Sequence, residues 1–241
     1  MVPEPRGRTM KNQYVGDQRD FVKYGLLREI RRAGMSVGVC WMLTPDDGGR
    51  DGNHTGYLLK PAYRACDAEL FDTMPHLRQA RHVGEVRARA LVADAAYYEE
   101  IVPPGREARR RWWEAGHAAM GRARLMFFDP DNGLITGSVS AGGRSAVKYA
   151  LDEEIREAVA AGRSVLIYQH WPRVERNTFC GRVRERLSAL HPQCAVCCLC
   201  TSGVLFAAMI QPQDAECWKT VERALAERWR GVITCWNGAT A

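Results

Sequence analysis

Four aspartates in two short segments are the residues of this chain best suited to catalysis. Asp17 and Asp20 lie three positions apart, and a single proline separates Asp129 from Asp131. Ionised carboxylates can orient a water molecule, accept a proton or stabilise a developing positive charge. We therefore treat all four as candidate catalytic residues. Whether they can act together depends on the helices and strands that position them.

Asp129 and Asp131 stand where an apolar run ends. The run Leu125–Phe128 breaks into Asp, Pro, Asp, Asn and Gly, the pattern of a buried strand leaving a parallel sheet. Open α/β sheets bind ligands outside the carboxyl ends of such strands, so Asn132 is a candidate for substrate binding. The alternative is an ordinary turn, because these are common turn residues. Two aspartates beside a buried strand favour the functional interpretation.

The segment Asn12–Arg28 precedes the first strand and carries the other two aspartates. We predict a helix from near Asp17, which can cap it, to Arg32. Its apolar face consists of residues spaced by threes: Phe21, Tyr24, Leu27 and Ile30. The polar residues of the segment are harder to explain by packing alone.

Asp20 can share one side of the first helical turns with Lys23 and Tyr24. Lys23 could contact a phosphate, act as a Schiff-base nucleophile or simply pair with Asp20. Acids near a helix start also suit the helix dipole without any further role. The candidate substrate-binding residues of this segment are Asn12, Tyr14, Lys23 and Tyr24.

A second buried strand, predicted over Arg163–His170, also ends in polar groups. Adjacent parallel strands deliver their carboxyl ends to one edge, so Gln169 and His170 are expected near Asp129. A histidine at a strand end opposite carboxylates is a candidate for binding or proton transfer, although most lone histidines are structural. Trp171 and Arg173 follow directly and complete the candidate binding residues.

The first strand, predicted over Ser36–Leu43, leads into the loop Thr44–Tyr57, which is rich in Gly and Asp. The glycine spacing matches neither dinucleotide-binding folds nor a P-loop, so we expect no nucleotide cofactor. Four residues of this loop could bind a metal, but a surface loop has the same composition, and we expect no metal site. These four residues are Asp46, Asp47, Asp51 and His54.

Strands and helices alternate along the chain, which predicts an α/β fold with a three-layer, doubly wound, mostly parallel sheet of the Rossmann-like type. We expect one domain over residues 1–241, with residues 1–10 a flexible lead and residues 58–122 a mainly helical insertion. The helices expected in that insertion cover Ala62–Met74, Val83–Ala96 and Gly105–Gly121.

Composition limits the function classes. A formal net charge of +6 favours a polyanionic partner such as nucleic acid, although many basic enzymes bind none. The chain has no apolar stretch of transmembrane length and no signal-peptide core, so we expect a cytoplasmic protein without a membrane partner. The sequence does not determine the oligomeric state.

Two further groups of residues have structural and functional interpretations. Arg109–Arg111 followed by Trp112 and Trp113 would suit phosphate contact and base stacking, but a solvated basic face with buried tryptophans is the favoured alternative. The strand-like Cys194–Cys200 places three of its four cysteines on one face and Cys197 on the other. We interpret the nine cysteines as mostly reduced and buried, not as a zinc site.

The order of elements from Leu125 onward resembles the second half of Rossmann-like methyltransferases, in particular the ribosomal-RNA adenine methyltransferases. In those enzymes a strand ends in Asp-Pro-Pro-Tyr, where this chain has Asp129-Pro-Asp-Asn132. The aromatic residue that stacks the target base is therefore missing. The loop Thr44–Gly56 also departs from their glycine-rich signature for S-adenosylmethionine.

A second resemblance rests on the segments Asn12–Arg28, Phe128–Leu134 and Tyr168–His170 together. They resemble a family of small bacterial proteins that we take to include phage-defence DNA glycosylases, which excise glucosylated hydroxymethylcytosine. The resemblance implies a cytoplasmic DNA N-glycosylase that extrudes a modified base, cuts its glycosidic bond and leaves an abasic site. It implies modified phage DNA as the partner.

Three alternatives stay open from the sequence. The chain could be an S-adenosylmethionine-dependent nucleic-acid methyltransferase. It could be a metal-dependent nuclease, because clustered aspartates can hold Mg²⁺. It could also be a non-catalytic nucleic-acid-binding module in which the carboxylates are structural.

Overall fold

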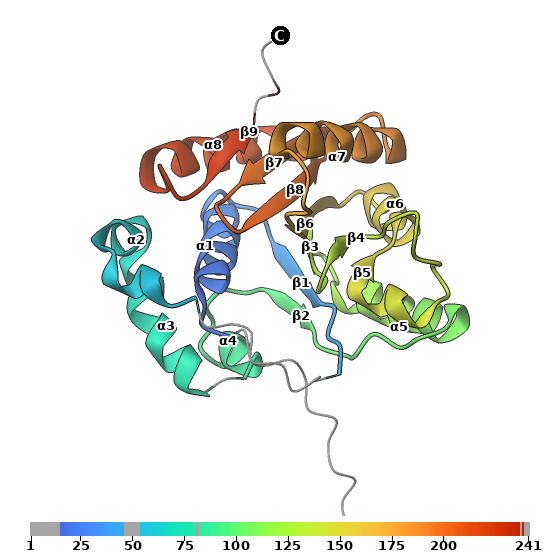
Figure 1. The fold of residues 1–241 in the computed structure, drawn as a ribbon, viewed down its shortest axis with the longest axis horizontal. Coiled ribbons are helices and arrows are strands. Elements are labelled where there is room, and N and C mark those ends of the chain that lie inside the picture. The colour runs from blue at the N-terminus through green and yellow to red at the C-terminus, as the bar shows by residue number, and fades with distance from the viewer. Residues whose placement is uncertain (1–14, 46–53, 81, 237, 239–241) are drawn as a thin grey trace, which may run out of the picture.

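A seven-stranded sheet with helices on both faces forms the centre of the molecule (Figure 1). The computed structural model describes residues 15–45, 54–80, 82–236 and 238. Within these residues the spatial order of the strands is β2 (Ala96–Tyr98), β1 (Val37–Trp41), β3 (Leu125–Asp129), β6 (Ser164–His170), β8 (Val204–Ile210), β7 (Ala195–Cys200) and β9 (Thr234–Trp236).

Four neighbouring strands run parallel to one another: β2, β1, β3 and β6. β8 is antiparallel to β6, and β7 is antiparallel to β8, so β7 again points in the direction of the first four strands. The sheet is therefore mostly parallel, and the predicted α/β, Rossmann-like class is confirmed. A separate two-stranded sheet pairs β4 (Gly133–Leu134) with β5 (Tyr149–Ala150).

Two clusters of apolar side chains, one on each face of the sheet, give the fold its three layers. One face packs against α1 (Gln18–Arg32), α3 (Ala68–Ala80), α4 (Gly84–Ala88) and α8 (Ala215–Arg228). The other packs against α5 (Arg106–Ala119), α6 (Asp152–Ala160) and α7 (Arg176–Leu190). Short helices complete the chain: η2 (Gly56–Leu59), α2 (Pro61–Cys66), η3 (Arg144–Lys148) and η4 (Pro212–Asp214).

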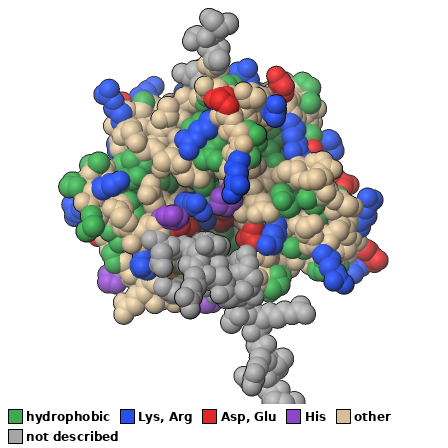
Figure 2. Space-filling view, viewed as in Figure 1, with side chains coloured by type: hydrophobic (Ala, Val, Ile, Leu, Met, Phe, Trp, Pro, Cys, Tyr) green, Lys and Arg blue, Asp and Glu red, His purple; other side chains and the backbone are tan. Residues whose placement is uncertain are grey.

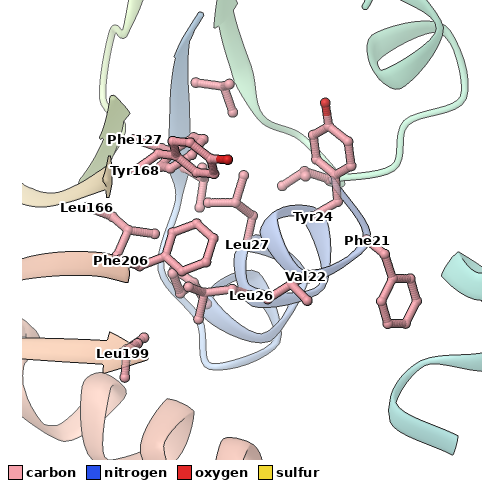
Figure 3. Packing of buried hydrophobic residues seen from close by; sticks show 14 of the residues in the cluster. Phe21, Val22, Tyr24, Leu26, Leu27, Phe127, Leu166, Tyr168, Leu199 and Phe206 are labelled. Carbon is pink, nitrogen blue, oxygen red and sulfur yellow. The ribbon is translucent and has the colours of Figure 1, made fainter. Parts of the chain in front are cut away.

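Helix α1 begins after Asp17, as the sequence predicts, and is buried over most of its surface. Figure 3 shows Leu26 and Leu27 facing Phe206 and Tyr168 of the sheet, whereas Phe21 points to the opposite side. The four residues of the expected apolar face are all buried, but they do not face one side, because α3 and α8 also pack against the helix. Consequently the polar residues at its start are held by a rigid element.

Two of the predicted helices are wrong in their extent. α4 ends at Ala88, and Ala90 and Asp94 then take positive φ angles of 48° and 52° before β2 adds an edge strand. The helix expected to start at Ala62 divides at Asp67, whose Oδ1 accepts a hydrogen bond from the Leu70 main-chain N at 3.1 Å. In both places tertiary contacts outweigh helix propensity.

The arginine and tryptophan run of α5 has the structural role that the sequence favoured. Trp112 and Trp113 are buried, and the Arg109 guanidinium pairs with the Glu154 carboxylate at 2.7 and 2.9 Å. Arg110 pairs with acidic side chains at the surface. The run contributes packing and ion pairs, with no exposed aromatic surface.

The cysteines of β7 lie as predicted. Cys194, Cys198 and Cys200 belong to the cluster on one face of the sheet, and Cys197 packs against the cluster on the other. All nine cysteines are free. Within the described part of the chain, no helix combines the length and apolar character needed to cross a membrane.

Candidate functional site

A cavity of about 470 Å³ opens at the carboxyl ends of β1, β3 and β6, beside the start of α1. α1 and its cap contribute Asp17, Asp20, Lys23 and Tyr24. β3 and the loop after it contribute Asp129, Asp131 and Asn132, and β6 contributes His170. Figure 2 shows acidic and histidine side chains near the middle of this face, with Lys and Arg side chains around them.

Asp17 has one carboxylate oxygen in use and one unused. Oδ1 accepts hydrogen bonds from the main-chain N of Arg19 and Asp20, at 2.8 and 3.0 Å, and so caps α1. Oδ2 is buried and has no hydrogen-bond partner among the described residues. Burial, and then repulsion by Asp20, raise the pKa of Asp17 to about 6. Such a group changes charge near neutral pH, as a general base must.

Lys23 lies between two carboxylates that come from different elements. Its Nζ donates to Asp20 Oδ1 at 2.9 Å and to Asp129 Oδ2 at 2.7 Å. The three side chains are only 10%, 6% and 13% exposed. Asp20 also accepts a hydrogen bond from the Gly16 main-chain N at 3.0 Å. When both carboxylates are ionised, one ammonium facing two carboxylates leaves this trio with one net negative charge.

Burial disfavours the charged form of Lys23, but Asp129 and Asp20 outweigh it and raise the pKa of the ammonium. Lys23 therefore stays protonated at neutral pH, whereas a Schiff-base nucleophile needs a free amine. The pairing with Asp20 that the sequence allowed is present. The second partner, Asp129, lies 106 positions away and was not predicted from the sequence.

Aromatic rings close the cavity around the ammonium. Lys23 Nζ lies 5.2 Å from the ring centre of Tyr168 and 5.6 Å from that of Tyr24. Tyr168 also meets His170 edge-on, with ring centres 5.1 Å apart. Burial, and then the charges of Arg19 and Lys23, lower the pKa of His170 to about 4. His170 is therefore neutral at pH 7 and can both donate and accept a hydrogen bond.

Asp131 and Asn132 lie on the loop after β3. Thr44 Oγ1 donates to Asp131 Oδ2 at 2.7 Å, which ties the loop after β1 to the loop after β3. The Asn132 main-chain N donates to the Lys148 main-chain O at 2.9 Å, while its side chain is exposed at the cavity. The structure thus brings together eight of the thirteen residues that the sequence predicts for the site.

Three predicted residues do not line this cavity. The Gln169 side chain accepts from the Leu134 main-chain N at 2.8 Å and donates to the main-chain O of Asn132 and His170. Trp171 Nε1 donates to the Thr201 main-chain O at 3.1 Å. Arg173 is exposed outside the cavity.

The contacts of Gln169 show how it supports the site. Gly133 has a φ of 109°, and a Cβ atom there would lie 2.3 Å from Gln169 Oε1. The glycine therefore permits the close approach of the amide to the backbone of the loop after β3. Gln169 fixes the course of that loop instead of facing the cavity.

Two predicted residues, Asn12 and Tyr14, lie outside the described residues, as do Asp46, Asp47 and Asp51. Among the residues that are described, no group of three or more His, Cys, Asp or Glu side chains is arranged to hold a metal ion.

Trp41 is a residue of the cavity that the sequence interpretation missed. It is buried at the carboxyl end of β1, stacks on Tyr97 with ring centres 4.9 Å apart, and lines the cavity. Its Nε1 has no hydrogen-bond partner among the described side chains and backbone. An unpaired buried N–H is costly, so this N–H is a candidate hydrogen-bond donor for a ligand. The available signal was its place at a strand end before a polar loop.

Comparisons with known proteins add no family assignment. Neither the search of protein-family models nor the search of curated proteins finds a match. The two resemblances described from the sequence therefore stay predictions.

Proposed function

We propose that this chain is a cytoplasmic DNA N-glycosylase that releases a modified base and leaves an abasic site. The observation that carries the proposal is the buried Asp17, with its pKa raised to about 6 and one unused oxygen, beside the trio of Lys23, Asp20 and Asp129. The family resemblance extends the proposal to defence against phages with modified DNA.

The chemistry follows from the charges. Ionised Asp17 takes a proton from water, and the resulting hydroxide oxygen bonds to the sugar C1′ as the glycosidic C–N bond breaks. The electron pair leaves with the base nitrogen, which takes a proton from solvent. The sugar acquires positive charge in the transition state, and the net negative charge of the trio stabilises it. The third N–H of Lys23 is available to the departing base.

Size and charge suit an extruded base. A cavity of about 470 Å³ lies within the range of small-ligand sites, roughly 300–1,000 Å³. Trp41 Nε1 and neutral His170 offer polar contacts to the edge of a base. Arg19 and Lys148 border the cavity, and their positive charges support a role in contacting flanking phosphates.

A methyltransferase is the second candidate, favoured by one observation. The segment Asp129-Pro-Asp-Asn132 follows a central parallel strand, where the methyltransferases that this chain resembles carry Asp-Pro-Pro-Tyr. Asn132 has no aromatic ring to stack on a target base, and Asp129 Oδ2 already accepts a hydrogen bond from Lys23 Nζ. Asp129 and Asn132 therefore fit adenine methyl transfer poorly.

The test is base release measured by mass spectrometry, with abasic sites detected by alkali cleavage. The purified protein is incubated with ordinary DNA and with glucosyl-hydroxymethylcytosine DNA, without added metal or cofactor. We expect release from the modified DNA and strands that stay intact until alkali is added, because Lys23 is protonated. The variants Asp17→Asn, Asp20→Asn, Asp129→Asn and Asp131→Asn are assayed in parallel.

Each alternative function has a different outcome in this assay. Undiminished release by all four folded variants would exclude this cavity as the active site. S-adenosylmethionine binding by calorimetry without base release would favour a methyltransferase, and chelator-sensitive strand cleavage a nuclease. Binding to DNA without turnover, unchanged in all four variants, would favour a non-catalytic module.

Trp41→Phe tests the unpaired indole N–H. The phenyl ring keeps the stacking on Tyr97 and removes a donor without a partner, so we expect a free energy of unfolding within about 1 kcal/mol of the wild type. Base release should fall about five-fold, since a hydrogen bond to the substrate is worth roughly 1 kcal/mol.

The matched control for Trp41→Phe is Trp218→Phe, because Trp218 is a buried tryptophan of α8 whose Nε1 has a partner, the Glu222 carboxylate at 3.1 Å. In that variant the free energy of unfolding should fall by about 1 kcal/mol, and base release should be unchanged. Equal activity of Trp41→Phe and the wild type would show that the substrate does not use this donor.

A further inference from the structure

A second hollow, the α7 groove, lies on the other side of β6 from the candidate active site. Its volume is about 280 Å³, and its lining includes the apolar side chains Leu134, Val174, Phe179 and Val183. Arg182 and Arg186 of α7 also line it. Val174 is 46% exposed, one of two large apolar side chains exposed to this extent among the described residues. An exposed apolar surface rimmed by polar groups marks a binding site.

The α7 groove and the active-site cavity are neighbours. Asn132 lines the cavity, Leu134 lines the groove, and Gly133 is the single residue between them. Two residues of extended chain span at most about 7 Å. Likewise His170 lines the cavity and the adjacent Gln169 lines the groove, because successive strand residues point to opposite faces. A ligand could therefore pass over the carboxyl edge of the sheet and occupy both.

The two arginines that line the groove favour an anionic ligand. Arg182 is exposed and forms no ion pair with any described residue. Arg186 pairs with Asp152, but its side chain is still 33% exposed. The groove thus combines apolar side chains with two arginines. Proteins use this combination to bind an unpaired base and its phosphate.

We propose that the α7 groove binds the base of an unpaired nucleotide next to the one that enters the active-site cavity. Phe179 contacts the face of this base, and Arg182 contacts its phosphate. The inference rests on the proposed function for the identity of the strand. It adds that the enzyme holds a flanking nucleotide out of the duplex, so the strand is locally unpaired at two positions.

The experiment measures binding of two fluorescent probes by anisotropy: an eight-nucleotide thymidine strand, and an abasic strand of the same length and charge. Arg182→Ala should weaken both about ten-fold and reduce the slope of log affinity against log salt by about one. Phe179→Leu should weaken only the thymidine strand, because base–aromatic contact is lost while phosphate contact stays.

Arg223→Ala is the matched control, since Arg223 is an exposed arginine on α8, in the other helical layer. The proposal is overturned if Arg223→Ala weakens binding as much as Arg182→Ala, or if Phe179→Leu affects both probes equally. It is also overturned if the wild type binds neither probe.

The same probes separate this inference from the proposed function. If Arg182→Ala and Phe179→Leu weaken binding as expected but no DNA releases a base, the proposed glycosylase function is wrong and the nucleotide groove is supported. If base release occurs and neither Arg182→Ala nor Phe179→Leu changes its rate or the substrate affinity, the glycosylase function is supported and the nucleotide groove is wrong. A circular dichroism spectrum of each variant checks that the overall helix content is unchanged.

Discussion

The Asp17→Asn variant is expected to lose base release by a factor of about 10²–10⁴ while gaining stability at neutral pH. The loss follows from the proposed role of Asp17, because an amide cannot take a proton from water. The fold should survive, because asparagine is as good an N-cap as aspartate. The amide oxygen can accept the same hydrogen bonds from the main-chain N of Arg19 and Asp20.

The gain in stability follows from the raised pKa of Asp17, about 6 in the folded chain compared with an ordinary value of 3.8. Between these pH values the folded state binds the proton more tightly than the unfolded state. The wild-type free energy of unfolding therefore falls as the pH rises through this window, by about 3 kcal/mol in total. Asparagine carries no such proton, so the variant lacks this decline.

Urea unfolding between pH 4 and pH 8 measures the stability effect, and base release over the same range measures activity. Wild-type activity should rise with pH through about 6, in the opposite direction to stability, because the ionised carboxylate is the active form. The matched control is Asp72→Asn, whose carboxylate pairs with Arg64 at the surface. It should behave as the wild type in both measurements.

Two results would contradict the assignment of Asp17. Base release with an unchanged pH profile in Asp17→Asn would remove it from the chemistry. A variant no more stable than the wild type at pH 8 would show that the buried carboxyl ionises without cost. The two results are independent, because one concerns substrate turnover and the other concerns only the folded chain.

The parts of this site that the sequence predicts are local. The cap at Asp17, the pairing of Asp20 with Lys23 three positions later, and the strand that ends at Asp129 all follow from spacing within a single element. Helix periodicity and strand length are visible in a short window of sequence. The class of the fold follows from the alternation of such windows.

The parts that the sequence does not predict depend on contacts between distant elements. Lys23 reaches Asp129 only because α1 packs across the ends of β1 and β3, and no periodic pattern encodes that placement. The sequence analysis expected Gln169 beside His170 in the site, but the two neighbouring strand residues face opposite sides of the sheet, and backbone groups use the Gln169 amide. Trp41 looks like an ordinary core residue until its N–H is found without a partner.

The second large effect is expected from Lys23→Met, which should lower the free energy of unfolding by about 3–5 kcal/mol at pH 7. Methionine fills a similar volume but leaves Asp20 and Asp129 facing each other without the ammonium. These carboxylates are only 6% and 13% exposed, so water cannot replace the lost partner fully. Burial already raises the pKa of Asp129 against the pull of Lys23, and removal of that pull should raise it further.

The matched control is Lys219→Met on α8. Lys219 pairs with Glu216 at 2.7 Å with the same three-residue spacing, but its side chain is 65% exposed and that of Glu216 is 85% exposed. Surface pairs of this kind contribute little, so the control should change stability by less than about 1 kcal/mol. The difference between the two variants isolates burial from helix propensity and from the general loss of a lysine.

The cause of the destabilisation has its own test in pH. If unpaired carboxylates cause it, lowering the pH until they take up protons should shrink the difference between Lys23→Met and the wild type. Lys23→Met combined with Asp129→Asn should likewise recover more than half of the loss, because only one buried carboxylate then remains. A difference that is constant with pH and unaffected by Asp129→Asn would mean that Lys23 stabilises the fold by packing its aliphatic chain against Tyr24 and Tyr168, and that the charged trio contributes nothing to it.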